Sequence, residues 1–367
     1  MSVARASSDQ SATGRGAALR IDHRAAVRGA VIVAFLAILL AVLPTFLGPD
    51  WITTLTSVAI YSVVALGFGL LYGRVGMISL GQIALLSIGV WAGLRFGYGT
   101  SLGFPLLLLI SGAITCVIGV LVGLPALRLS GLFLALITLM FAGATTIVLA
   151  AIDFPNGGGG FTGRTNGVDV SGSVRMRRPS WAEGDTAYYR YTLIVCAIMF
   201  LLALLHVAGK SGRAWAAIRA SEPAALAAGV NITLYKLWAF ALASFMTGVA
   251  GCLMAGQIGV PRVSQFQTQD SLTLAATAMI GGIFSLWGAV VAGVFNQLLP
   301  FLLQSGQLWG WTIDVNILLI VFGVGLLQVL LTAPGGIVQQ FPKDMANLGR
   351  LIARQVRKLS GHRKEPA

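Results

Sequence analysis

The chain has 367 residues, of which 56% are hydrophobic and 10% are charged. Soluble domains carry about 25% charged residues, so this composition excludes an ordinary soluble domain and indicates an integral membrane protein. The formal net charge is +13. Because the basic residues gather at the N-terminus, in one central polar segment and in the C-terminal tail, they favour inside-facing loops and anionic lipid over nucleic-acid binding.

The N-terminal half predicts a basic arm followed by six membrane crossings. Residues 1–26 are polar and rich in small residues, which is typical of a disordered cytoplasmic arm. Val27–Leu47 lacks a closely following cleavage site, so we expect a retained span rather than a signal peptide. A bilayer core about 30 Å thick needs roughly 20 apolar residues per helix. Further candidate runs are 53–72, 80–97, 104–126, 131–151 and 191–208.

A long polar loop, residues 153–190, separates the fifth and sixth runs. With the N-terminus inside, an odd number of crossings places this loop outside the cell. It contains several arginines against the usual inside bias, but long loops cross the membrane largely regardless of charge.

The central polar segment, residues 209–236, carries four basic residues and one acid, Glu222. Lys and Arg are enriched in cytoplasmic loops, so the segment is expected inside, as the six crossings independently require. We predict two short helices here, with a break at Ala220-Ser221. Ser221 is a suitable N-cap, Pro223 fits the first turn, and Gly229 fits the left-handed position after the helix.

The predicted helix pair has a surface suited to binding another protein. Trp215, Ile218 and Leu226 would form an apolar side, whereas Arg213, Arg219 and Glu222 would form a polar rim suited to a protein partner. The alternative is a solvated connector with helical character.

The remaining apolar runs are 237–259, 271–304 and 313–332. Counted as three crossings, they would leave the basic tail outside. The run 271–304 is long and is interrupted by Gly281-Gly282 and by Gly288, so we predict two passes, one of them short. A broken helix is tolerated where it faces protein or a water-filled cavity, which makes this break a candidate for the translocation path. The alternative is a close packing contact between glycines.

These counts predict an all-α, polytopic bundle of about ten transmembrane segments, with a permease domain over residues 27–340. Residues 341–367 form a basic tail whose apolar residues recur at helical spacing, and this pattern predicts an amphipathic helix on the cytoplasmic leaflet.

No catalytic, metal or cofactor site is predicted. The three cysteines and three histidines are scattered along the sequence. Gly209-Lys210-Ser211 imitates the end of a phosphate-binding loop, but Leu204 stands where the loop requires glycine, so we expect no ATP binding by this chain. Ionisable groups are nearly absent from the runs, which disfavours an ion-driven carrier. The energy for transport is therefore expected from a partner.

Several motifs, taken in order, resemble the permease subunits of branched-chain amino acid ABC importers, of the LivM type. They include Tyr72–Gln82, Leu127–Thr138, Gly160–Gly167 and Ala217–Gly229, and they continue through Gly281–Gly288 to Pro334–Ile337. The resemblance covers roughly residues 50–340.

The resemblance implies a bacterial inner-membrane subunit with cytoplasmic termini. It also implies a second homologous permease, two cytoplasmic ATPases that bind the ATP and Mg, and a periplasmic or lipid-anchored substrate-binding protein. The function implied is passage of branched-chain amino acids, and the alternatives are urea or a short-chain amide as cargo, or an ion-coupled secondary carrier.

The resemblance further implies that the central segment contains the loop that couples to the ATPase. The expected coupling residues are Ile218, Arg219, Ala220, Ser221, Glu222, Pro223, Ala224, Ala225, Leu226 and Gly229. Four residues are expected at the translocation path: Gly81, Gln82, Gly281 and Gly282.

Overall fold

The computed structural model describes residues 48–126, 131–164, 176, 178–179 and 181–304, together with 317, 320, 323–325, 327–328, 336 and 338. The chain divides between Gly48 and Pro49 into two units, and the account below concerns the second. The predicted N-terminal arm, the first span at 27–47 and the amphipathic tail lie outside the described residues, as does most of the run 313–332.

The described part of the second unit is helical and contains no strand. The helices are α3 (Pro49–Gly69), α4 (Gln82–Gly99), α5 (Phe104–Ala126), α6 (Leu132–Ile152), α7 (Asp185–Ala208), α8 (Lys210–Ala220), α9 (Glu222–Ala227), α10 (Ile232–Ile258), α11 (Thr268–Gly281), α12 (Leu286–Gly293) and α13 (Leu299–Gln304). Two π-helical stretches, η1 (Leu70–Val75) and η3 (Val294–Leu298), continue α3 and α12, and η2 (Val263–Gln265) is a short 3₁₀ turn.

Six helical stretches of the described residues are long and apolar enough to cross a membrane. They are Pro49–Val75, Phe104–Pro125, Leu132–Ile152, Asp185–Ala208, Ile232–Ile258 and Leu286–Leu303. The prediction of an all-helical, multi-pass membrane protein is therefore confirmed. The count of about ten segments stays a prediction. α11 has 14 residues, and at 1.5 Å per residue it spans about 21 Å, which is less than a full bilayer core.

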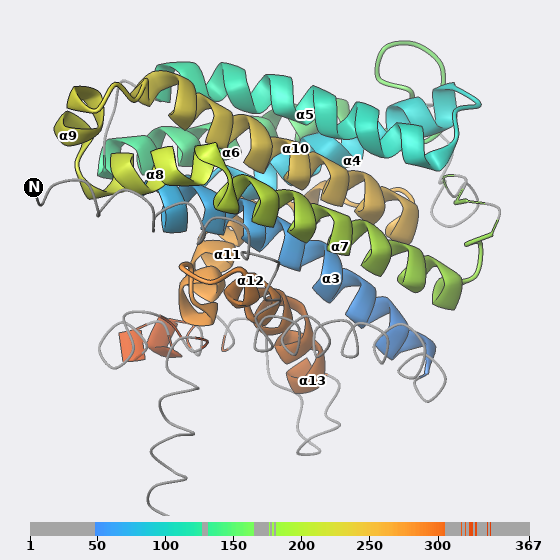
Figure 1. Cartoon of the computed structure of the whole chain (residues 1–367). Coiled ribbons are helices and arrows are strands. Elements are labelled where there is room, and N and C mark those ends of the chain that lie inside the picture. The colour runs from blue at the N-terminus through green and yellow to red at the C-terminus, as the bar shows by residue number, and fades with distance from the viewer. Residues whose placement is uncertain are drawn as a thin grey trace, which may run out of the picture. The chain divides into compact units, whose positions relative to one another are not determined.

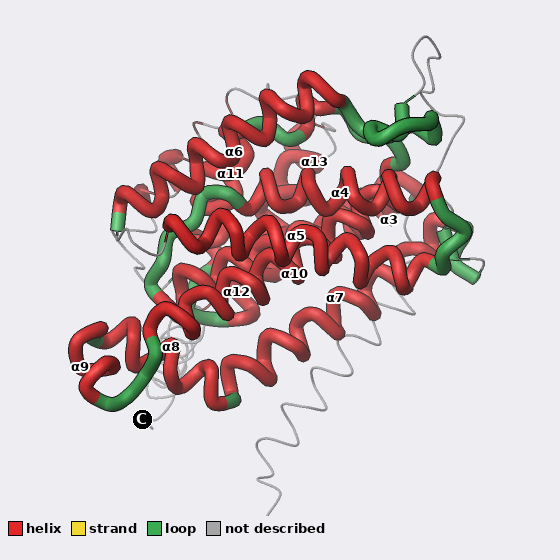
Figure 2. Tube along the Cα trace, turned by 90° about the horizontal axis from the view of Figure 1, so that it is seen from above, coloured by secondary structure: helices red, strands yellow, loops and turns green. Residues whose placement is uncertain are grey.

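α3 and α10 form the buried centre of the bundle, and most of their side chains are covered by other helices. α10 packs against α5, α4 and α3, while α3 also contacts α7 and α12. In Figures 1 and 2, α5, α10 and α4 lie side by side, and α11 to α13 lie beside α3. α6 is mostly exposed, which leaves an apolar face for lipid or for another subunit.

Small residues allow α4 and α10 to approach closely. A Cβ added to Gly89 would lie 2.7 Å from the carbonyl oxygen of Gly248, closer than real Cβ contacts come. The Ser111 hydroxyl of α5 donates to the carbonyl oxygen of Gly89, at 2.6 Å. Close backbone approach and interhelical hydrogen bonds are the main attractions between helices in a lipid environment, so this three-helix contact fixes the centre of the bundle.

Four helices begin earlier than hydropathy predicts, α7 and α10 by the largest margins. α7 begins at Asp185 instead of 191, because Tyr188 and Tyr189 are buried and the Tyr188 hydroxyl donates to the carbonyl oxygen of Leu253 at 2.6 Å. α10 begins at Ile232 instead of 237, where the side chain of Asn231 caps its first turn. A search for apolar runs does not detect polar and aromatic residues that are buried in the bundle or that cap a helix.

Arg178 is one of the arginines in the predicted external loop, and its contacts explain its presence there. Its guanidinium donates to the carbonyl oxygens of Gly256 and Gln257 in the last turn of α10, and it is paired with Asp185 at 2.7 Å. A cation at a helix C-terminus is stabilised by the helix dipole and by the free carbonyl groups found there. Arg178 therefore has a structural role where α7 begins and α10 ends.

Candidate coupling site

α8 and α9 form a short helix pair at one end of α10, and the predicted break at Ala220-Ser221 is confirmed. Figures 1 and 2 show the pair at the same end of the bundle as the start of α10. The Ser221 hydroxyl accepts from the Ala224 N–H at 3.4 Å, with Pro223 in the first turn as expected. These caps give the pair a defined shape despite its short length.

The end of α9 also agrees with the prediction from Gly229. Gly229 has φ +79°, its N–H bonds to the Leu226 carbonyl, and the Val230 N–H bonds to the Ala225 carbonyl. This pair of bonds is a Schellman motif, which strongly favours glycine at the left-handed position. The chain can therefore turn sharply from α9 into α10.

α8 is anchored to the bundle by Trp215. Its side chain is fully buried, and its Nε1–H donates to the carbonyl oxygen of Tyr235 at 2.8 Å. Ile218 is also buried, on the same side of α8. Of the predicted apolar side, Trp215 and Ile218 face the bundle, whereas Leu226 is 60% exposed because α9 protrudes from the bundle and buries only Ala225.

Glu222 at the start of α9 pairs with Lys236 in α10. The Lys236 Nζ lies 2.7 Å from the Glu222 Oε1, and the Lys236 side chain is 10% exposed whereas that of Glu222 is 50% exposed. The lysine is thus held within the protein and the carboxylate stays at the surface. A surface groove of about 600 Å³ runs beside this pair, with Leu226 and Ile232 among its lining residues.

Arg219 is exposed, as predicted for the polar rim, but it also contacts the bundle. Its guanidinium donates to the carbonyl oxygen of Gly73 in η1 and lies over the ring of Phe284, 4.4 Å from the ring centroid. Phe284 belongs to the non-helical link between α11 and α12. A hydrogen bond and a cation–π contact therefore connect α8 to two membrane-embedded elements at once.

The link between α11 and α12 also presses directly on η1. A Cβ on Gly73 would overlap the carbonyl oxygen of Ile283, so only glycine fits at this position. One turn earlier, a Cβ on Gly69 would lie 3.7 Å from the same oxygen, an ordinary contact. The end of α3, the α11–α12 link and α8 thus meet at one junction.

The predicted division of the run 271–304 is confirmed, since α11 ends at Gly281 and α12 begins at Leu286. Gly282, with φ +110°, makes the turn. A Cβ on Gly281 or on Gly288 would overlap backbone atoms of the other helix. In this conformation the break is therefore a close glycine packing contact, the alternative left open by the sequence.

The other two residues predicted at the path, Gly81 and Gln82, are also buried in packed surroundings. A Cβ on Gly81 would lie 3.3 Å from the ring of Phe141, and the Gln82 Oε1 accepts from the Thr247 hydroxyl at 2.8 Å. The Gln82 Nε2 is buried without a hydrogen-bond partner among the described residues. Gly81 and Gln82 lie together at the start of α4, apart in sequence from the α11–α12 break, and their role in a path stays a prediction.

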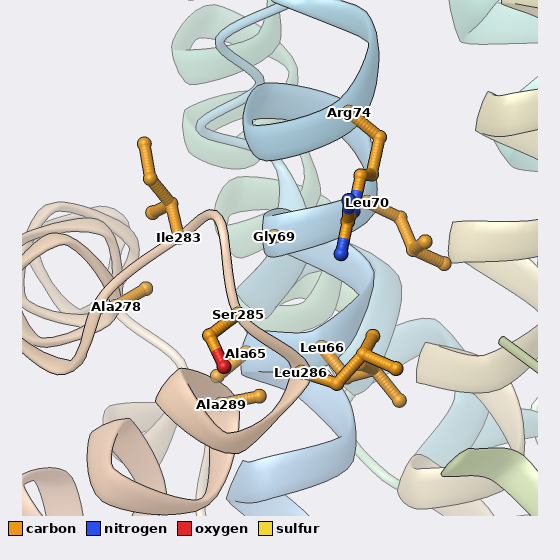
Figure 3. Close-up of a pocket in the computed structure, with 10 residues that line it drawn as sticks. All are labelled: Ala65, Leu66, Gly69, Leu70, Arg74, Ala278, Ile283, Ser285, Leu286 and Ala289. Carbon is orange, nitrogen blue, oxygen red and sulfur yellow. The ribbon is translucent and has the colours of Figure 1, made fainter. Parts of the chain in front are cut away.

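A small cavity separates α3 from the α11–α12 link. Its volume is about 10 Å³, which is close to the minimum for one water molecule. Figure 3 shows Leu66 of α3 near Leu286 of α12, while the Arg74 side chain of η1 is directed back along α3 and lies beside Leu70. The junction is nearly closed here.

Sequence reasoning missed Gly73 and Phe284 as parts of the site. Gly73 lies within the motif Tyr72–Gln82, and Phe284 lies within Gly281–Gly288. Both motifs carry the family resemblance, but neither indicates a contact with Arg219. Their contact with Arg219 spans separations of 146 and 65 positions in the sequence, and no local pattern encodes such a contact.

The fold defines a multi-pass helical membrane protein with a protruding helix pair, which Trp215 joins to α10 and Arg219 joins to η1 and the α11–α12 link. The chain belongs to the family of branched-chain amino acid transport system permease components, whose family model matches residues 51–331. Membership in this family makes it a component of a transporter.

Three curated proteins are similar to the chain. Two are the high-affinity branched-chain amino acid transport system permease proteins LivM of Salmonella typhimurium and Escherichia coli. They are 27% and 28% identical over 65% and 66% of this chain, and the matches cover 60% of each relative's length. The third is the fructose import permease protein FrcC of Rhizobium meliloti, which is 27% identical over 75% of this chain and 76% of its own length. No solved structure matches the chain.

Proposed function

We propose that the chain is the transmembrane permease subunit of an ATP-driven ABC importer, and that it receives the motion of its ATPase partner through α8 and α9. Membership in the permease family supports the class of function. The observation that carries the mechanism is the position of Arg219, which joins the protruding helix pair to η1 and to the α11–α12 link.

The route of transmission follows from the packing at that junction. The coupling residues of α9 are exposed except for Ala225, so they are available to a partner. Trp215 fixes α8 to the start of α10. A force on α9 would therefore move α8 as a rigid helix. Arg219 then transmits the displacement to Gly73 and Phe284, where α3 and α11–α12 are held together.

Alternating access requires two states that bind the partners differently. In the structure the glycines of η1, α11 and α12 are in backbone contact, and we take this arrangement as the closed state. Displacement of α8 would separate the α11–α12 link from η1 and open the small cavity between α3 and α12. We place the moving part of the translocation path at this seam, with Gly281 and Gly282 as the pivot.

The proposed partners are a second homologous permease, two cytoplasmic ATPases and a binding protein on the outer side. ATP and Mg would be bound by the ATPases. α6 offers an apolar face for the second permease or for lipid, since Met140 and Ile147 are 74% and 73% exposed. In this arrangement the protein lies in a bacterial inner membrane, with α8, α9 and both termini in the cytoplasm.

The proposed cargo is a branched-chain amino acid. The similarity to the LivM proteins supports this choice. The similarity to FrcC covers more of both chains, so a sugar is the second candidate, and urea or a short-chain amide is the third. Ligand binding by the co-encoded binding protein, measured with leucine, fructose and urea, tests this choice.

A labelling experiment tests the position and role of the helix pair. Ala224 is exposed in α9 and Arg262 is exposed beyond the opposite end of α10, so Ala224→Cys and Arg262→Cys form a matched pair. The half-buried Cys116 is first replaced by serine, since Cys196 and Cys252 are buried. In intact spheroplasts, an impermeant thiol reagent should label position 262 and not 224. Position 224 should crosslink to the ATPase. Labelling of 224 from outside would refute the proposed orientation.

A further inference from the structure

A basic groove lies between α7, α8 and η1, on the side of α8 opposite its buried face. It has a volume of about 570 Å³, and its lining includes Arg74 of η1, Val207 of α7, and Arg213, Ala216 and Arg219 of α8. Trp215 and Ile218 occupy the other face of α8, packed against the bundle. The groove is thus built from three separate elements and is not a single charged helix face.

Among the residues that the structure describes, none compensates the charge of the groove. Its lining contains three arginines and no carboxylate. None of the ion pairs among the described residues involves Arg74, Arg213 or Arg219. Arg219 is held by the Gly73 carbonyl and the Phe284 ring, contacts that leave its positive charge unneutralised. Like charges gathered in one concave surface favour a bound anion.

The location of the groove indicates which anion fits. Val207 is in the last turn of α7, one of the apolar helices long enough to cross a membrane, so the groove lies at the level where such a helix leaves the hydrocarbon. Leu204 and Leu201, about one and two turns earlier on α7, are 48% and 53% exposed. An apolar surface suited to acyl chains therefore lies along α7 next to the groove in which a phosphate would bind.

We propose that this groove binds the phosphate headgroup of an anionic phospholipid, with the acyl chains lying along the exposed leucines of α7. Arginine suits this role because its planar guanidinium makes paired hydrogen bonds to phosphate oxygens. A basic pocket between helices at the membrane surface is a recognised type of lipid headgroup site. The inference concerns the lipid and does not depend on which solute the protein carries.

Lipid binding to the purified full-length protein tests the proposal. Native mass spectrometry would compare phosphatidylglycerol with phosphatidylcholine of the same acyl chains, at equal concentrations. We expect the phosphatidylglycerol adduct to be several-fold more abundant. The double variant Arg74→Gln/Arg213→Gln should lower this adduct to the phosphatidylcholine level, whereas Arg262→Gln, which removes an exposed arginine beyond the opposite end of α10, should not. Arg213→Gln alone, at an exposed position, should give a partial loss and covers the case in which the double variant fails to fold.

Two further measurements distinguish lipid binding from binding of a soluble anion or of the ATPase. Inorganic phosphate and glycerol phosphate should not compete at the concentration at which phosphatidylglycerol saturates, because they lack acyl chains. Competition at equal concentration would overturn the lipid assignment in favour of a soluble anion. Equal binding of the two lipids, or unchanged binding by the arginine variants, would overturn the site itself. Displacement of the lipid by stoichiometric ATPase would assign the groove to protein docking and also overturn the proposal.

Discussion

The guanidinium of Arg219 donates a hydrogen bond to the carbonyl oxygen of Gly73, so the last turn of α8 is tied to the π-helical end of α3. A π-helical turn shifts the backbone hydrogen bonds of a helix and is often found at functional sites. The same guanidinium lies over Phe284. One side chain outside the buried core therefore contacts both elements that move apart in the proposed transport mechanism.

Arg219→Lys should separate ATP turnover from uptake. Lysine keeps the charge but loses the planar group that bonds to Gly73 and stacks on Phe284. Loss of a hydrogen bond to a charged group costs about 1.5–3 kcal/mol, which corresponds to a roughly tenfold or larger loss of coupling. Uptake per ATP hydrolysed in proteoliposomes should fall by that factor. Arg213→Lys is the control, since Arg213 makes neither contact, and an equal loss there would argue against a special role for Arg219.

Gly73→Ala should disrupt the junction, whereas Gly69→Ala should be tolerated. The added methyl group at 73 would overlap the Ile283 carbonyl, but at 69 it would meet the same oxygen at 3.7 Å. Overpacking of this kind costs about 1–3 kcal/mol. The thermal stability of the purified protein and its uptake in the full complex should both fall for Gly73→Ala alone. If the two variants behaved alike, the close contact between η1 and the α11–α12 link would be wrong.

Glu222→Lys should uncouple ATP turnover from uptake while membrane insertion remains intact. The Lys236 side chain is only 10% exposed, so reversing the charge of its partner leaves a nearly buried cation beside a second one, and thermal stability should fall together with uptake. The informative control is the swap Glu222→Lys/Lys236→Glu, which rebuilds the pair with reversed charges. Because we assign the surface carboxylate to partner docking, the swap should stay uncoupled. Full recovery of uptake would mean that the internal pair matters instead.

Trp215→Ala should loosen the helix pair, whereas Leu226→Ala should not. Trp215 is fully buried and hydrogen-bonded, and Leu226 is 60% exposed. Removing a buried aromatic side chain costs about 3–5 kcal/mol, enough to detach α8 from α10. Limited proteolysis should cut residues 209–231 much faster in Trp215→Ala than in the wild type. Equal cleavage of the wild type and both variants would contradict the anchoring role.

The local shape of the coupling segment could be predicted because its residues specify it locally. Ser221, Pro223 and Gly229 each suit only one position in a helix–break–helix arrangement, and all three occupy it. The break after Gly281 was predictable for a similar reason, since a 34-residue apolar run exceeds one crossing and the glycine pair interrupts it.

The contacts of that segment could not be predicted, because they depend on tertiary packing. An arginine in a basic loop normally faces solvent, and nothing in the sequence near Arg219 indicates Gly73 or Phe284 as its partners. The exposure of Leu226 could not be predicted either, because an apolar residue does not indicate whether its helix packs on the bundle or protrudes from it, as α9 does. The early start of α7 was missed because its first turns are polar and aromatic.

The central claim, that this protein is moved by a motor bound at α8 and α9, is tested most directly by solute accumulation in proteoliposomes. The vesicles would contain this chain alone, or the chain with its second permease, ATPases and binding protein, with ATP supplied on the side of the ATPases. The account predicts that solute is concentrated only by the full assembly with ATP. It also predicts that the Arg219→Lys assembly hydrolyses ATP with little accumulation. Accumulation against a gradient by this chain alone, or full accumulation by the Arg219→Lys assembly, would contradict the claim.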